Sequence, residues 1–506
     1  MIEALENFNW MQLILYWQWL FLLYFLAINA AYLSLNYIAL YAIIGYMRDH
    51  RAEYLPKSLT AYQPPVSMLV PAFNEERTIV SSVRSLLRLN YPQFEIVLIN
   101  DGSSDGTLQA IIEAFGMVEF PEAYRRRIPT KAVHKIYASA RYPQVRLIDK
   151  ENGGKSDALN AGINCARYPM FCAMDADCIL QQDSLGRVVR PFLEDPRTVA
   201  VGGVIRVLNG CTVHDGMLEK VELPRTLLPM FQLVEYLRAF LFGRLGWSPL
   251  NALLVISGAF GVFYKERVIA VGGYRSGTVG EDMDLVVRLH LALRKEKRAY
   301  RITFVPDPIC WTEAPHDLRS LKSQRTRWQR GLAESVMPNF GYMFSRKSGT
   351  VGWMAFPYMV FFELFGPLIE VFGYVATIVL WALDLIPATS FLVFLFVSIG
   401  LGVLLSVNAF FLEQLSFHMY PRFGQQLRLF LVAIIENFGY RQINSVWRLM
   451  ALVQWTFSFW RKGQWGKIRR SGAWQRPTEA VAAPEPEPVP PAPPPPPHIN
   501  PQPRAK

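Results

Sequence analysis

The sequence predicts an α/β domain set between long apolar segments that suit a membrane. Short runs rich in β-branched residues alternate with helical stretches between residues 65 and 335. Long apolar runs lie before and after that region. Strands that alternate with helices of this length form a parallel sheet with helices on both faces. We therefore expect a sheet of this kind, with membrane helices on either side of it in the chain.

Composition agrees with a chain of several parts, at least one of which lies in a membrane. The 506 residues exceed an ordinary domain, and 51% hydrophobic with 13% aromatic residues is rich for a soluble protein. The formal charge of +11 is not gathered on one compact basic domain, so we expect no nucleic-acid partner. Basic runs such as 125–127 and 469–470 are typical of segments that face the cytoplasm. The 5 cysteines show no metal or disulfide-motif spacing, which predicts reduced, mostly buried thiols.

The first apolar run covers residues 10–46 and contains no charged side chain. A membrane span needs about 20 residues, so this run allows one long tilted helix or a tight hairpin. Glu3 and Glu6 precede it, whereas Arg48 and Arg51 follow it. This asymmetry favours a single crossing with the N-terminus outside. No basic region precedes the run, so a cleavable signal peptide is not expected.

Within the α/β region we expect a helix over residues 76–89. Strands are expected at four apolar runs: 66–70, 95–99, 145–148 and 171–174. Polar loops follow the second and fourth of these runs directly. In such sheets ligands bind beyond the carboxyl ends of the strands, so these two loops are the first candidates for a binding site.

The C-terminal part contains four further apolar runs. They cover residues 354–383, 391–411, 427–435 and 446–459. The first two predict membrane spans. Glu436, Asn437 and Arg441 interrupt the second pair, and charges at membrane depth are costly unless they face protein or water. We therefore expect a hairpin or broken helix that lines a cavity, with five crossings in all and three as the alternative. Residues 224–247 mix apolar with basic side chains, which fits either a core helix or one lying flat on the membrane.

The expected domain organisation has four parts. They are an N-terminal transmembrane segment (1–50), a cytoplasmic α/β domain with interfacial helices (51–350), a C-terminal transmembrane region (351–462) and a basic, then Pro-rich tail (463–506). The tail has too few apolar residues to form a core, so disorder or polyproline II is expected there. An accessory protein is a candidate partner for it.

Four polar signatures occur in a fixed order along the α/β region. They are Asn100-Asp101-Gly102-Ser103-Ser104-Asp105-Gly106, Asp175-Ala176-Asp177, Gly280-Glu281-Asp282 and Gln324-Arg325-Thr326-Arg327-Trp328. Each alone has an ordinary explanation, such as a turn sequence or an acid at a helix start. Two carboxylates spaced as in Asp175 and Asp177 also suit Mg²⁺ or Mn²⁺, which prefer hard oxygen ligands. Lys155 follows two glycines that allow close approach, so it can reach a phosphate.

With these signatures in this order, residues 65–335 resemble the processive family 2 glycosyltransferases, which include poly-N-acetylglucosamine, hyaluronan, chitin and cellulose synthases. The resemblance implies a GT-A-like fold and a metal-dependent, inverting transfer from a UDP-sugar to a growing β-linked polysaccharide. It also implies export through the chain's own helices, in a multi-pass protein of the inner membrane with a cytoplasmic catalytic domain. Single-sugar transfer to a membrane lipid and a non-catalytic receptor or scaffold are the alternatives.

The resemblance also implies roles for particular residues. Asp282 is the expected general base, with Glu281 beside it. Asp177 is expected at the metal, and Asp175 is expected near both the metal and the ribose. The remaining donor-binding residues are expected to be Pro71, Glu75, Asp101, Lys155 and Arg327, and the acceptor-binding residues Trp328, Gln324 and Ser257. The segment 257–260 matches cellulose synthases only in part, and residues 202–209 resemble amino-sugar polymerases more closely, which favours N-acetylglucosamine over glucose.

Overall fold

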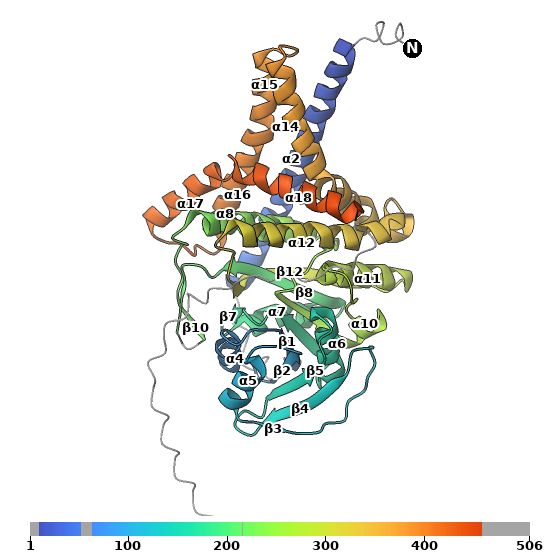
Figure 1. Ribbon diagram of the computed structural model, residues 1–506, viewed down its shortest axis with the longest axis vertical. Helices are drawn as coiled ribbons and strands as arrows, with labels where there is room; N and C mark the ends of the chain where they lie inside the picture. The colour runs from blue at the N-terminus through green and yellow to red at the C-terminus, as the bar shows by residue number, and fades with distance from the viewer. Residues whose placement is uncertain (1–9, 52–62, 215, 458–506) are drawn as a thin grey trace, which may run out of the picture.

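The structure is a computed structural model that describes residues 10–51, 63–214 and 216–457. The basic stretch 461–470 and the Pro-rich tail lie outside the described residues. Figure 1 shows three parts stacked along the long axis of the molecule: an α/β domain, a layer of helices lying across the middle, and helices that rise away from that layer.

The α/β domain is built on a 10-stranded sheet with the order β3-β4-β5-β2-β1-β6-β11-β8-β12-β7. All four expected strands are present, as β1 (Val66–Ala72), β2 (Phe94–Asp101), β5 (Val145–Lys150) and β6 (Met170–Met174). The other strands of the sheet are β3 (Met117–Glu119), β4 (Val133–Ser139), β7 (Ile179–Leu180), β8 (Thr198–Val207), β11 (Phe260–Tyr264) and β12 (Arg301–Thr312). Strands β9 (Thr212–His214) and β10 (Met217–Lys220) form a separate ribbon.

The sheet is mixed, so the expectation of a parallel sheet was wrong in part. The neighbours β5-β2-β1-β6 are parallel, but β11 runs antiparallel between β6 and β8. Strand β4 is likewise antiparallel to β5. The apolar run of β11 is buried along nearly its whole length. A strand buried on both faces has the same continuous apolar pattern in either direction, so the sequence does not reveal its direction.

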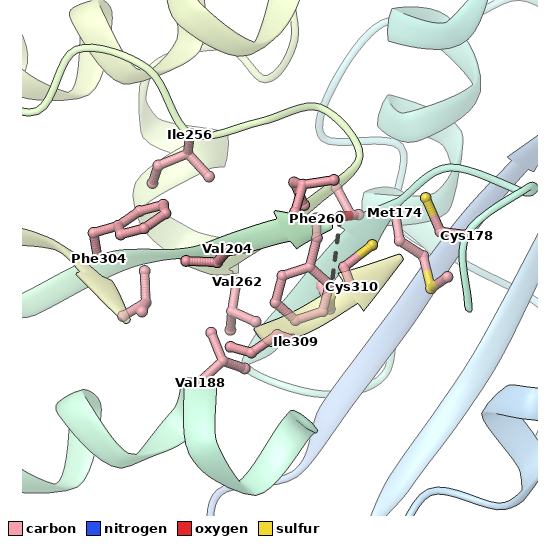
Figure 2. Packing of buried hydrophobic residues seen from close by; sticks show 14 of the residues in the cluster. Met174, Cys178, Val188, Val204, Ile256, Phe260, Val262, Phe304, Ile309 and Cys310 are labelled. Carbon is pink, nitrogen blue, oxygen red and sulfur yellow. Dashed lines mark hydrogen bonds between the residues drawn. The ribbon is translucent and has the colours of Figure 1, made fainter. Parts of the chain in front are cut away.

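Helices cover both faces of the sheet and bury its apolar side chains. They are α4 (Ile79–Leu87), α5 (Thr107–Phe115), α6 (Lys155–Cys165), α7 (Ser184–Glu194), α10 (Lys265–Ala270) and α11 (Glu281–Lys295). Helix α4 is shorter than the helix expected over 76–89. Figure 2 shows part of the core, where Val188 of α7 faces Phe260 and Val262 of β11 and Ile309 of β12.

The middle layer connects the sheet to the apolar helices. It contains α8 (Leu227–Leu237), η1 (Arg238–Arg244), α9 (Leu245–Trp247), α12 (Leu318–Val336), α17 (Phe423–Ile435) and α18 (Tyr440–Phe457). Helix α17 packs against α8, and α18 packs against α12. The apolar side chains of α8 are mostly buried, including Met230, Leu233 and Val234. The region 224–247 is therefore a core element between the catalytic domain and the helices above it.

Two helices of the described residues are long and apolar enough to cross a membrane. One is α2 (Trp10–Arg51), a single helix as expected, and the other joins α15 (Ala388–Leu395), η6 (Phe396–Gly400) and α16 (Leu401–Ser416). A third candidate is a pair bent by 42°, Val351–Leu364 with α14 (Gly366–Ala382). The expected count of five is not found here, whereas three agrees with the alternative. Helix α17 is too short to span, and Tyr440 and Arg448 of α18 bond to α8 and α12 in the middle layer.

Candidate active site

The carboxyl ends of parallel strands bring the predicted polar loops together. Ala72 at the end of β1 pairs with Asn100 of β2, and Asp101 pairs with Lys150 at the end of β5. The loops after these strands therefore share one edge of the sheet with the loop after β6. The sequence correctly predicted this gathering.

Asp101 organises the glycine loop that leads into α6. Its carboxylate accepts hydrogen bonds from the Gly153 amide at 3.0 Å and the Gly154 amide at 2.7 Å. Lys150 Nζ, which is fully buried, lies 2.7 Å from Asp101 and 2.7 Å from Asp157. The buried lysine is therefore neutralised by two carboxylates. A carboxylate has about four lone-pair sites, so Asp101 retains acceptor capacity for a ligand beyond these three donors.

Lys155, the first residue of α6, lies among acids. Its Nζ is 2.5 Å from Asp175 Oδ1 and 3.6 Å from Glu281 Oε1, and it donates to the Gly258 carbonyl at 3.0 Å. Burial opposes the charged form, but the neighbouring carboxylates of Asp175 and Glu281 outweigh burial and raise the pKa of Lys155. The ammonium thus holds together acids from two separate signatures.

The two acids after β6 differ in exposure. The Asp175 side chain is 31% exposed, whereas Asp177 is buried. Burial raises the pKa of Asp177 to about 7, and the nearby charges of Asp175 and, to a smaller extent, Glu313 add to the shift. Thr312 Oγ1 donates to Asp177 at 3.4 Å. These acids repel one another, which is the situation that a bound divalent cation relieves.

The donor set fits a metal that a substrate helps to hold. Among the described residues, no group of three or more His, Cys, Asp or Glu side chains is arranged to bind a metal ion. Asp175 and Asp177 can supply carboxylate oxygens only as a pair. Mg²⁺ is commonly bound through one or two carboxylates together with substrate phosphates. The pair therefore fits a cation that arrives with a diphosphate.

Glu281 and Asp282 open helix α11 beside this pair. Asp282 accepts hydrogen bonds from the Gly258 amide at 2.9 Å and from its neighbour Met283 at 2.8 Å. Burial raises the pKa of Glu281 to about 7, with Lys155 opposing the shift and Asp282 adding to it. Because Gly258 also accepts from Lys155, the loop that begins at Ser257 connects the lysine to the acid pair.

Helix α11 is fastened to α12 at the same point. Gly280 and Gly331 touch so closely that a Cβ on Gly331 would lie 2.9 Å from the Gly280 Cα. Glu334 of α12 accepts from the Thr278 hydroxyl at 3.0 Å and the Val279 amide at 2.9 Å. The acid pair and the helix that bears Trp328 therefore form one rigid unit.

Trp328 lies on α12 with 44% of its surface exposed. The Arg325 guanidinium carbon lies 4.4 Å from the centre of the Trp328 ring. Arg325 is itself fixed by two hydrogen bonds to Glu235, both 2.8 Å long. Gln324, Arg327 and Trp328 have the spacing that places side chains on one helix face. The indole ring is thus held in place yet remains accessible.

The turn after β1 holds the remaining predicted residues. Pro71 is paired with Ile99 within the sheet. The Glu75 amide donates to Thr107 Oγ1 at 2.9 Å, and its carboxylate accepts from Thr78 at 2.7 Å. Both residues therefore shape the sheet edge, with Glu75 partly engaged by its own turn.

Sequence reasoning missed residues that position the site rather than fill it. Lys150, Glu235 and Gly331 were not singled out, and Arg325 was named within a signature but was given no role. A lysine that directly ends an apolar strand was the available signal for Lys150. Glu235 and Gly331 carry no local signal, because their partners are distant in the chain.

The domain thus has a mixed, GT-A-like sheet with several acids gathered at the carboxyl edge of its parallel strands. Residues 67–124 match the model described as glycosyl transferase family 2, and residues 129–331 match the model described as glycosyltransferase like family 2. Through this domain the chain belongs to glycosyltransferase family 2.

Two staphylococcal proteins are similar to part of this chain. A Staphylococcus aureus poly-β-1,6-N-acetyl-D-glucosamine synthase is 32% identical over 277 residues, which is 54% of this chain and 56% of that protein. The Staphylococcus epidermidis protein of the same name is 27% identical over 312 residues, or 60% of this chain and 65% of that protein. The chain thus matches less than two thirds of the length of either relative.

Solved structures include a mannosyltransferase from Pyrobaculum calidifontis in complex with GDP-mannose and Mn²⁺. It is 19% identical, with a TM-score of 0.47, and the match covers 82% of this chain and 99% of that one.

Proposed function

We propose that the protein transfers a sugar from a UDP-sugar to a growing β-linked polysaccharide, with inversion at the sugar carbon. The junction of α11 and α12 carries this proposal, because it joins the acid pair to the helix of the exposed indole. UDP-N-acetylglucosamine is favoured over UDP-glucose by the names of the staphylococcal relatives.

In the proposed reaction Asp282 is the general base. Its carboxylate is oriented by the Gly258 and Met283 amides, so an oxygen can accept the proton of an acceptor hydroxyl. The acceptor oxygen forms a bond to the sugar C1 while the bond from C1 to the phosphate oxygen breaks on the opposite face. The electron pair and the negative charge leave with UDP. Lys155 remains protonated beside Glu281 and Asp175, which limits the repulsion among the acids.

The donor is proposed to lie along the sheet edge. Asp101, Pro71 and Glu75 border the nucleotide, and Arg327 binds the diphosphate as a bidentate partner. Asp175 and Asp177 would hold Mg²⁺ or Mn²⁺ together with the diphosphate. When bound, that ion neutralises charge on the departing UDP.

The acceptor is proposed to stack on Trp328. An indole face offers a flat apolar surface to a sugar ring. Gln324 lies one helical turn before it, and Ser257 precedes Gly258, whose amide donates to Asp282. The end of the growing polysaccharide would thus be held near Asp282 between successive sugar additions.

The middle layer supports a path for the product. Tyr440 donates to Glu235 at 2.9 Å, Ser445 to Glu370 at 2.6 Å, and Arg448 to Gln329 at 2.7 Å. These polar contacts join α18 to α8, to α14 of the bent candidate span and to α12, in that order. We propose export through these helices, with the catalytic domain in the cytoplasm, the N-terminus outside and the domain borders expected from the sequence.

Turnover of sugar nucleotides by the purified full chain tests this function. UDP-N-acetylglucosamine or UDP-glucose would be supplied with Mg²⁺ or Mn²⁺, and UDP release and product size would be measured together. We expect UDP release with a product that lengthens over time. A product that stops at one sugar on a lipid would favour the single-transfer alternative. No turnover of either donor by a well-folded protein would favour a scaffold.

A further inference from the structure

A cavity of about 260 Å³ lies in the catalytic domain, away from the residues assigned to the reaction. Three segments line it: the connection from β3 to β4, the end of α6 and the start of α10. Its charged lining consists of the cations Arg125, Arg127, Arg167 and Lys265 and the acids Glu122 and Glu266. We call it the basic cavity.

The basic cavity is well separated from the proposed donor site. Helix α6 begins at Lys155 in that site and ends at Cys165 in the cavity. Its 11 residues span about 16 Å at 1.5 Å per residue. Figure 1 shows β3 and β4 at the end of the domain farthest from α14 and α15, so proximity to a membrane does not account for the basic run at 125–127.

Hydrogen bonds fix the walls of the cavity. Asn164 Oδ1 accepts from the Arg127 and Ile128 amides, both at 3.0 Å, and its Nδ2 donates to the Ile128 carbonyl at 2.8 Å. Lys265 donates to the Ala166 carbonyl at 2.8 Å, which occupies an acceptor at the end of α6. The cavity is therefore bounded by backbone that is tied together.

The acids do not balance the cations. Glu122 already accepts from the buried Arg146 at 2.5 Å and from Arg167 at 2.9 Å. Arg127 and Glu266 form an ion pair at 2.5 Å, but their side chains are 46% and 62% exposed. Exposed pairs of this kind contribute only about 0–1 kcal/mol, so an incoming anion can replace Glu266. Arg125 is exposed and has no ion pair within the described part of the chain.

We propose that the basic cavity binds a small soluble anion bearing a phosphate or diphosphate group. Guanidinium groups match phosphate oxygens in pairs, and Arg125 and Arg127 come from the same loop. The volume lies just below the roughly 300–1,000 Å³ of pockets for drug-sized ligands, which favours an anion smaller than a nucleotide-sugar. The bound anion contacts the connection from β3 to β4, the end of α6 and the start of α10, and so links these three segments.

Binding of inorganic pyrophosphate and phosphate to the full-length protein in detergent tests the site. Isothermal titration would be run in chelator, so that no metal supports a diphosphate at Asp175 and Asp177. The test variant is Arg125→Gln with Arg127→Gln. The control, Arg141→Gln with Arg298→Gln, removes the same charge from two other exposed positions.

We expect one pyrophosphate site whose affinity falls at least tenfold in the test variant and stays within twofold in the control. Sugar transfer without added pyrophosphate stays within twofold in both variants, and their melting temperatures match that of the parent protein. Equal binding by the test variant, no binding of either probe by the parent, or stoichiometric displacement of pyrophosphate by UDP would overturn the proposal. The last outcome would assign the anion to the donor site instead.

Discussion

Two sets of acids occupy the same edge of the sheet and have opposite surroundings. Asp101 and Asp157 share the buried Lys150, and glycine amides donate to Asp101 as well. Asp177 and Glu281 are equally buried, yet the pKa of each is raised to about 7. The protein itself completes the first set. The second set has a net excess of negative charge that a bound donor and cation would relieve.

This difference distinguishes acids that stabilise the fold around the site from acids that are proposed to take part in the reaction. A buried acid with a full set of donors stabilises the fold. A buried acid whose pKa is raised by burial and by nearby carboxylates costs stability in the free protein, and such groups are concentrated at functional sites. Replacing one acid at a time by its amide tests whether the two groups of acids have different roles.

Asp282→Asn tests the acid that follows Glu281 of the second set at the start of α11, and it has the largest expected effect. The amide keeps the shape of the side chain but cannot accept the acceptor proton. Loss of a general base lowers the rate by about 10² to 10⁴. Polymer formation would be measured beside the melting temperature and UDP binding, both of which should stay close to those of the parent protein. A rate near the parent value would remove the base assignment.

Asp101→Asn tests the structural set. It leaves Lys150 with one carboxylate and weakens the anchor of the glycine loop. Loss of one partner from a buried charged hydrogen bond costs about 1–3 kcal/mol of unfolding free energy. Chemical denaturation of the detergent-purified protein would measure it. Unchanged stability with lost donor binding would instead assign Asp101 to the ligand alone.

Gly331→Ala tests the junction between the two helices. The added methyl group would meet the Gly280 backbone, so α11 and α12 have to separate. Overpacking of this kind costs about 1–3 kcal/mol, and we expect polymer synthesis to fall further than UDP binding. The matched control is Gly424→Ala, where nothing lies within 4 Å of the added Cβ. Equal behaviour of the two variants would contradict the rigid unit.

The pH dependence of stability gives the smallest effect. Because the pKa values of Asp177 and Glu281 rise to about 7, the folded protein binds protons there that the unfolded chain has lost. Without metal, this contribution to stability is full below about pH 4 and is lost as the pH rises to about 7. Melting temperatures in chelator should show it, and Glu281→Gln should flatten the slope. Glu151→Gln is the control, because the pKa of Glu151 is lowered by Lys131 and its titration lies below this range. If the melting temperature of Glu281→Gln depends on pH as steeply as that of the parent protein, the raised pKa of Glu281 is contradicted.

The sequence predicted the strands and the gathering of polar loops, because runs of apolar residues and turn signals are local. It did not reveal the antiparallel β11, since buried strands have the same pattern in either direction. Of the two expected numbers of membrane crossings, three agrees with the candidate spans of the described residues and five does not. The runs 427–435 and 446–459 were expected to form a hairpin or broken helix, whereas Arg448 of α18 donates to Gln329 of α12.

The site residues show the same contrast between local and long-range information. The motifs identified the acids, but they did not reveal which basic groups and backbone amides contact these acids. Lys150 contacts Asp101, and Gly331 contacts Gly280; both partners are far away in the chain, and only folding brings them together.

The central claim is that the second set of acids acts on a bound UDP-sugar and on a polysaccharide whose end stacks on the Trp328 indole. Trp328→Ala tests this claim most directly. UDP release and product length would be measured on the same preparation, with Trp353→Ala as a control at another exposed tryptophan. We predict that elongation is lost while hydrolysis of the UDP-sugar by water stays within a few-fold, because the donor residues and the base remain in place. Equal loss of both activities in a well-folded variant, or unchanged polymer length, would contradict the account.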